Sequence, residues 1–145
     1  MNENQKRLKQ RAIQAAGEAF AKQQYVRPID IFLGMQLLLP ADVEDWRKGR
    51  IPYLERKIQS GLGKITFYMK CFREWALHSG LKPSPTVYLS KTRGGRKELR
   101  FSKSGHPIIE QSYRTHYVSP VLAEIKQKNQ SVVILWPEEH FSEVL

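Results

Sequence analysis

Side chains that could cleave RNA without a metal gather between residues 100 and 116. Such cleavage needs a general base, a general acid and a cation that stabilises the charged phosphorane. Histidine titrates near neutral pH, so His106 and His116 could each serve as acid or base, with Arg114 as the cation. The residues of suitable type are Arg100, Lys103, His106, Tyr113, Arg114 and His116. A small metal-independent ribonuclease is therefore one hypothesis, although the same residues are ordinary constituents of a turn and a strand.

Metal-dependent and thiol chemistry have weaker support. The only aspartates are Asp30, Asp42 and Asp45, so the second half of the chain lacks the converging carboxylates of a two-metal site. One cysteine and four scattered histidines show no zinc-ligand spacing. Cys71 lies among large apolar residues, which predicts a buried thiol and not a nucleophile. We expect no metal site and no cofactor.

The segment KTRGGRKELRFSKSGH, residues 91–106, is unusually basic. Six of its sixteen residues are Lys or Arg, and Glu98 is its single acid. The whole chain has 24 basic and 14 acidic residues, for a net charge of +10. Residues 91–116 hold seven bases and two acids, or +5 of that total. A balance of this kind favours polyanionic partners, with nucleic acid first.

Two predicted strands, residues 86–92 and 97–103, flank a pair of glycines and indicate a β-hairpin. Hairpin loops of three residues commonly end in a glycine with positive φ. A loop over residues 93–95 would keep four apolar side chains on one face, in the pairs Leu89–Leu99 and Val87–Phe101. This register predicts a hairpin with an apolar inner face and a cationic outer face.

On the outer face, the same register places Tyr88 opposite Arg100, and Lys91 opposite Lys97. Like charges directly opposed destabilise a ladder, and a bound phosphate would relieve their repulsion. An outward Tyr88 ring could also stack on a base. We therefore predict non-catalytic binding of nucleic acid, DNA or RNA, through its phosphate backbone. The predicted face consists of Tyr88, Lys91, Arg93, Arg96, Lys97, Arg100, Lys103, His106 and Arg114.

The next turn, SKSGHP at residues 102–107, adds a second possible anion site. Successive backbone N–H groups in a glycine-containing turn can cradle an anion. Pro107 is expected to open a short helix, whose N-terminus would favour negative charge. An alternative function is that of a protein-interaction module or inhibitor, which would present the same basic hairpin to an acidic protein partner.

The elements expected to position these residues form an α+β fold in a single domain, residues 1–145. Apolar periodicity predicts a helix over residues 4–23 and a long helical run over 54–76, with a break at SGLG (60–63). Further helices are expected from Pro40 and over residues 121–128, and a final turn or helix over 138–145. Strands are expected at 115–119 and 131–136. Helices thus dominate residues 4–80, and strands dominate residues 85–145.

The remaining sequence features concern location and an alternative motif. A single cysteine, no signal-like start and no apolar stretch of membrane-spanning length predict a soluble cytoplasmic protein with no membrane partner.

A helix-turn-helix over residues 40–59 is disfavoured. With Gly49 in its turn, charged residues such as Lys48 and Arg50 would occupy positions that are usually apolar.

Overall fold

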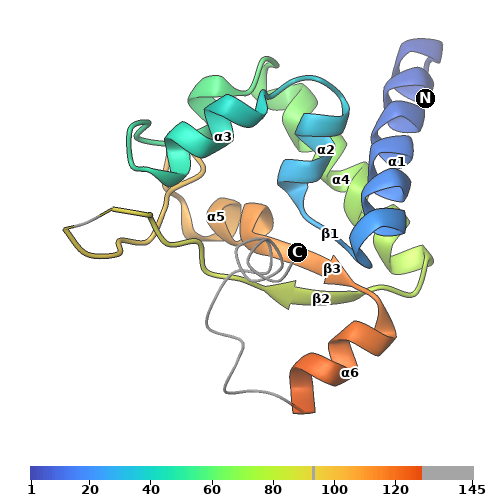
Figure 1. Cartoon of the computed structure of the whole chain (residues 1–145). Helices are drawn as coiled ribbons and strands as arrows, with labels where there is room; N and C mark the ends of the chain where they lie inside the picture. The colour runs from blue at the N-terminus through green and yellow to red at the C-terminus, as the bar shows by residue number, and fades with distance from the viewer. Residues whose placement is uncertain (93, 129–145) are drawn as a thin grey trace.

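The computed structural model describes residues 1–92 and 94–128, which form an α+β arrangement of helices and a small antiparallel sheet (Figure 1). The helices are α1 (Glu3–Gln23), α2 (Pro28–Gly34), α3 (Pro40–Arg47), the 3-10 helix η1 (Leu54–Lys57), α4 (Leu62–His78), α5 (Pro107–Arg114) and α6 (Pro120–Lys128). The strands are β1 (Tyr25–Val26), β2 (Lys82–Pro85) and β3 (Thr115–Val118). None of the described helices combines the length and apolar character that a membrane crossing requires.

Helix α1 confirms the helix expected over residues 4–23. A capping box formed by Asn2 and Gln5 begins the helix, and its alanine-rich face packs on α2 and α4. The small side chains allow a close approach to α2. A Cβ atom built at Gly34 would lie 2.7 Å from the Ala15 Cβ, so this crossing requires glycine.

The apolar run over residues 54–76 is divided, as the sequence predicted, at residues 60–63. Its first part forms η1, and Gly61 then begins α4. Leu62 in this run is 64% exposed. The buried residues of the stripe are Leu54, Ile58, Ile65, Phe72 and Ala76. Since η1 is only four residues long, no second helix of a helix-turn-helix follows α3 in the described residues.

The sheet has the order β1-β3-β2, with both pairings antiparallel. The central strand β3 confirms the strand expected at 115–119. Strand β2 forms from KPSP, whose prolines are compatible with an edge position because each lacks a backbone N–H. Helices α5 and α6, which flank β3 in the chain, confirm the helix expected from Pro107 and the one expected over 121–128.

Neither of the two strands predicted for the hairpin forms. Residues 86–92 and 97–103 share one isolated bridge, between Leu89 and Glu98, and are otherwise irregular. The predicted strand at 131–136 and the predicted tail element at 138–145 lie outside the described residues.

An aromatic cluster joins the second half of the chain to the helical half. The Trp46 ring centroid lies 4.8 Å from that of Phe101, and Phe101 stacks on Tyr113 at 5.2 Å. Tyr88 meets the Phe101 ring edge-on at 5.1 Å. The Trp46 indole N–H also donates to the Arg100 carbonyl at 2.8 Å. The segment between β2 and α5 is therefore fastened to α3.

Candidate nucleic-acid interface

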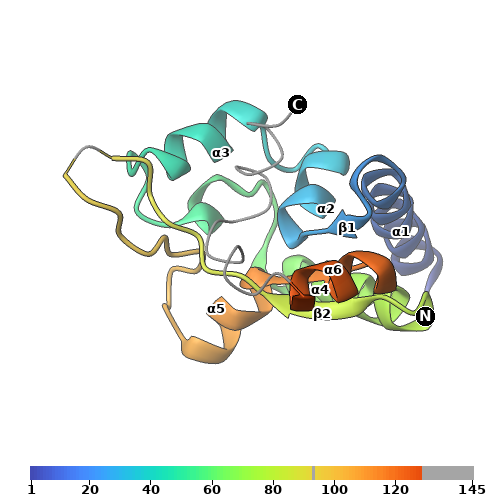
Figure 2. The same cartoon turned by 60° about the horizontal axis from the view of Figure 1, so that its bottom comes forward.

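Residues 86–92 and 94–100, here called the basic arm, project beside α3 on the side away from α1 (Figures 1 and 2). The base of the arm is held by hydrogen bonds from Leu99 N–H to the Tyr88 carbonyl at 2.7 Å and from Ser90 N–H to the Lys97 carbonyl at 2.8 Å. Lys91 N–H donates to the Arg47 carbonyl at 2.7 Å. The two segments of the arm are thus joined to each other at the base, and the arm is also held against α3.

The predicted outward position of Tyr88 is wrong. The register is shifted by one residue from the expected one, since Leu89 faces Glu98 and not Leu99. A shift of one residue reverses the faces of a strand. Tyr88 is accordingly 0% exposed and Val87 49% exposed, the opposite of the prediction, whereas Leu99 and Phe101 are buried as expected.

The reason for the shift lies in the partners of Tyr88. Its ring packs against Trp46 and Phe101, and its hydroxyl lies 2.5 Å from His116 Nε2. A buried aromatic ring removes more apolar area from water than a valine does, and its polar end here has a partner. Tyr88 therefore belongs to the core, where it has no surface to offer a base.

The expected opposition of Lys91 and Lys97 is also absent. Lys97 N–H donates to the Ser90 hydroxyl at 3.0 Å, and the register that joins Leu89 to Glu98 places Arg96 across from Lys91. The prediction of a glycine with positive φ at the tip is confirmed, because Gly95 has φ +110°. Arg93 lies outside the described residues.

Three cationic side chains of the arm, Lys91, Arg96 and Lys97, are exposed. None of them forms an ion pair within the part of the chain that the structure describes. Glu98, the one acid of the arm, accepts from the Arg114 guanidinium at 2.5 Å. The arm thus presents positive charge that no internal carboxylate neutralises, while Arg114 is already paired.

The other predicted cations lie closer to the body of the protein. The Arg100 guanidinium donates to the Ser102 carbonyl at 2.7 Å and to the Lys103 carbonyl, and lies 5.8 Å from the centre of the Tyr53 ring. Lys103 is exposed. Arg100 therefore braces the following turn, and Lys103 is the exposed cation of that turn.

The turn at residues 101–107, here called the anchored turn, is not the anion cradle that the sequence suggested. Glu110 is buried, and its carboxylate accepts from Phe101 N–H at 2.8 Å, Ser102 N–H at 2.7 Å and the Ser102 hydroxyl. Three further backbone donors also have internal acceptors, in the pairs Lys103 N–H to Glu55, Gly105 N–H to Ser102 Oγ and His106 N–H to Ser104 Oγ. Internal oxygens therefore accept from most of the backbone donors that an anion would need.

The three residues of the ribonuclease hypothesis have separate structural roles. His106 is exposed and caps α5, because its Nδ1 accepts from Ile108 N–H at 3.2 Å. His116 is 0% exposed and stacks on Tyr25. Arg114 pairs with Glu98. Since His116 has no exposed surface, the two histidines do not share a face on which a substrate would lie.

Two of the residues considered for metal and thiol chemistry, Asp30 and Cys71, are largely buried in the structure. Among residues 1–92 and 94–128, no three His, Cys, Asp or Glu side chains are grouped so that they could hold a metal ion. Asp30 forms a buried ion pair with Arg27 at 2.6 Å. Cys71 is buried as predicted, and desolvation raises the pKa of its thiol, which disfavours the reactive thiolate.

A groove between α4 and α5 was not anticipated from the sequence. Leu62, Ile108 and Ile109 line it and are exposed. The apolar stripe predicted over residues 54–76 includes Leu62, which was therefore expected to be buried. Ile108 and Ile109 fall within the short helix expected from Pro107, for which no exposed apolar face was predicted. The signal in the sequence was the pair of adjacent isoleucines directly after Pro107, in the first turn of the short helix.

No protein-family model, no curated protein and no solved structure matched the chain. We therefore infer function from the residues and their geometry alone.

Proposed function

We propose that the chain binds nucleic acid without catalysis, through contacts between the basic arm and backbone phosphates. The observation that carries the proposal is the set of exposed, unneutralised cations on a braced projection, Lys91, Arg96 and Lys97. Cations of this kind attract phosphate by Coulomb interaction and by release of the counterions condensed on nucleic acid. A cytoplasmic location, predicted from the sequence, is compatible with such a partner.

The burial of Tyr88 favours a duplex over a single strand. Proteins that bind single strands combine a basic groove with aromatic rings on which bases stack. On the described basic arm the only aromatic side chain is Tyr88, and it is buried. The major groove of B-form DNA is about 12 Å wide and admits elements as broad as a helix or a two-stranded ribbon, whereas the major groove of A-form RNA is deep and narrow. The two adjoining segments of the arm would therefore enter the B-form groove more readily. We therefore expect DNA duplexes to bind best.

The decisive experiment replaces the arm cations and measures affinity. Fluorescence anisotropy with a DNA duplex of about two helical turns gives the dissociation constant at two salt concentrations. The triple alanine variant should bind at least about tenfold more weakly, and its logarithmic salt slope should fall by about 2 to 3, since each phosphate contact contributes about 0.9. The variant carries Lys91→Ala, Arg96→Ala and Lys97→Ala.

A matched control removes the same charge from elsewhere on the surface. Its substitutions are Lys22→Ala, Lys57→Ala and Lys64→Ala, three exposed lysines in α1, η1 and α4. This variant should retain most of the affinity. Equal losses in the two variants would mean that net charge, and not the arm, governs binding. Unchanged binding in the arm variant would refute the assigned surface.

Two further measurements separate the alternatives. A pull-down that resists nuclease treatment, and that depends on the arm cations, would point to an acidic protein partner. Incubation with labelled RNA in EDTA, compared with the His106→Ala and His116→Ala variants, tests the ribonuclease hypothesis. From the burial of His116 we expect no histidine-dependent cleavage.

A further inference from the structure

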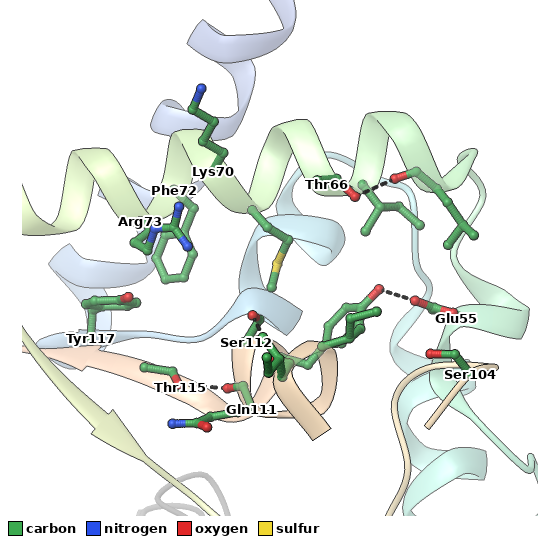
Figure 3. Close-up of a pocket in the computed structure, with 16 residues that line it drawn as sticks. Glu55, Thr66, Lys70, Phe72, Arg73, Ser104, Gln111, Ser112, Thr115 and Tyr117 are labelled. Atoms are coloured by element: carbon green, nitrogen blue, oxygen red, sulfur yellow. Dashed lines mark hydrogen bonds between the residues drawn. The ribbon is translucent and has the colours of Figure 1, made fainter. Parts of the chain in front are cut away.

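A groove with a volume of about 700 Å³ lies between α4 and α5 (Figure 3). Helix α4 forms one wall and α5 the other. Thr115 and Tyr117 of β3 lie at one end, and the hydrogen bond from the Tyr113 hydroxyl to Glu55 lies toward the other. Of the residues predicted for the nucleic-acid face, none lines the groove.

The groove gathers large aliphatic side chains that face solvent. Leu62 is 64% exposed, Ile108 71% and Ile109 42%, and the half-buried Met69 lies between the helices. Single exposed apolar residues are normal, but a patch contributed by two different helices around a hollow marks an interaction site. The α5 helix turns Glu110 and Tyr113 inward and its two isoleucines outward, so the patch is a consequence of how α5 is anchored.

The shape of the groove suits an elongated partner. Seven residues of α4 line the groove. Six of them recur at spacings of three, one, three, one and three residues, which is one stripe of a helix: Leu62, Ile65, Thr66, Met69, Lys70 and Arg73. The seventh, Phe72, is buried beside this stripe. The stripe covers eleven residue steps, or about 16 Å at 1.5 Å per residue. Three turns of a helix laid along this wall would meet it with side chains at three- and four-residue spacing.

Among the described residues, the charged side chains that line the groove are two cations and one carboxylate. Lys70 and Arg73 of α4 line it. Lys70 lies 4.0 Å from the Glu74 carboxylate, whereas Arg73 has no carboxylate partner in the described part of the chain, so Arg73 is the main cation offered to a ligand. Glu55 is the single acid among the lining residues. Its carboxylate already accepts from the Tyr113 hydroxyl at 2.7 Å and from Lys103 N–H at 2.9 Å. Burial and this hydrogen bond raise the pKa of Tyr113, so the phenol remains a neutral donor.

We infer that the α4–α5 groove is a docking site for an amphipathic helix of a partner protein, with acidic residues beside its apolar stripe. The apolar stripe would cover Leu62, Ile108 and Ile109, and the acidic flank would meet Arg73 and Lys70. Such helix-in-groove recognition buries apolar anchors and uses charge to select the partner. The inference stands independently of nucleic-acid binding, because the two surfaces share no residue.

The probe is a synthetic amphipathic peptide of about four helical turns, with leucines at the i, i+3, i+4 and i+7 positions and glutamates on both flanks. Its twin carries lysine in place of each glutamate. Anisotropy titrations of the full chain should show saturable binding of the acidic peptide, and binding at least about tenfold weaker for the twin. No saturable binding, or equal binding of the twins, would overturn the inference.

Matched variants locate the binding. Leu62→Ser and Ile108→Ser should each weaken the acidic peptide about tenfold, whereas Leu77→Ser should not, although Leu77 is on the same helix and 54% exposed. Arg73→Gln should weaken binding and reduce its salt dependence, with the exposed Lys64→Gln as its control. A loss with Leu77→Ser equal to that with Leu62→Ser would reject the groove.

Because an acidic peptide could also be drawn to the basic arm, the arm triple variant is part of the test. It should bind the peptide as wild type does, while the groove variants should bind the DNA duplex as wild type does. Peptide binding lost only in the arm variant would assign the peptide to the arm. Circular dichroism melting checks that each variant is folded, which we expect because every replaced side chain is exposed.

Discussion

The tip of the basic arm and the anchored turn have similar compositions but different environments. Both contain small residues and at least one lysine, and both were predicted to contact phosphate. At the tip, Lys91, Arg96 and Lys97 are exposed and unpaired in the described structure. In the anchored turn, the backbone donors belong to Glu110, Glu55 and nearby serines. Composition alone therefore does not separate exposed cations, which we propose bind phosphate, from a structural turn. The difference lies in whether internal acceptors surround the donors.

The largest expected effect is on the anchored turn. Glu110→Ala removes the acceptor of two buried backbone N–H groups and of the Ser102 hydroxyl. Buried donors left without a partner each cost about 1 to 3 kcal/mol, so we expect a loss of about 3 to 5 kcal/mol in the free energy of unfolding. Urea unfolding measures it. The exposed neighbour provides the control, since Gln111→Ala should change stability by less than about 0.5 kcal/mol.

The same measurement tests whether the anchored turn really differs from the tip of the basic arm. If Glu110→Ala left stability unchanged, the turn would not depend on its internal acceptors, and its N–H groups would again be available to an anion. The difference between the two regions would then disappear.

A smaller effect is expected where the arm meets the core. Tyr88→Phe keeps the ring against Trp46 and Phe101 but removes the hydroxyl next to His116, so unfolding free energy should fall by about 1 to 2 kcal/mol. Affinity for duplex and single-stranded DNA should stay within about twofold of wild type, because the ring is buried. A selective loss of single-strand affinity would show that Tyr88 reaches bases and would reverse the assignment of this residue to the core.

Most of the helices could be predicted because their signals are local. Asn2 caps α1, Pro40 and Pro107 begin α3 and α5, and Gly61 lies where the apolar stripe of residues 54–76 breaks. Periodicity and end signals of this kind act within one or two turns, so a sequence reveals them. The α+β class follows from the same signals.

The face of Tyr88 could not be predicted because it depends on distant residues. Its partners are Trp46, more than forty positions earlier, and His116, twenty-eight positions later. Pairing Leu89 with Leu99 satisfies the local pattern equally well, and only these long-range contacts decide the one-residue shift. The same holds for the turn, where the acceptors Glu55 and Glu110 come from η1 and α5.

The smallest effect tests the charge of the arm itself. Glu98→Gln removes the single acid of the arm and its ion pair with Arg114. Glu98 is largely exposed, and ion pairs at the surface contribute about 0 to 1 kcal/mol, so unfolding free energy should change by no more than that. The arm gains one net positive charge, and Arg114 is released as a possible phosphate partner. Affinity for a DNA duplex should therefore rise by about two- to fivefold at low salt.

The gain in DNA affinity of the Glu98→Gln variant should diminish as salt is raised, because at moderate ionic strength salt screens interactions between exposed charges more than about 10 Å apart. The Glu74→Gln variant is the matched control, since it removes an exposed acid on α4 that lies 4.0 Å from Lys70, away from the arm. A gain in both variants would reflect net charge alone. A gain confined to Glu98→Gln would place the phosphate at the arm, and a loss would mean that the Glu98–Arg114 pair holds the arm in its binding geometry.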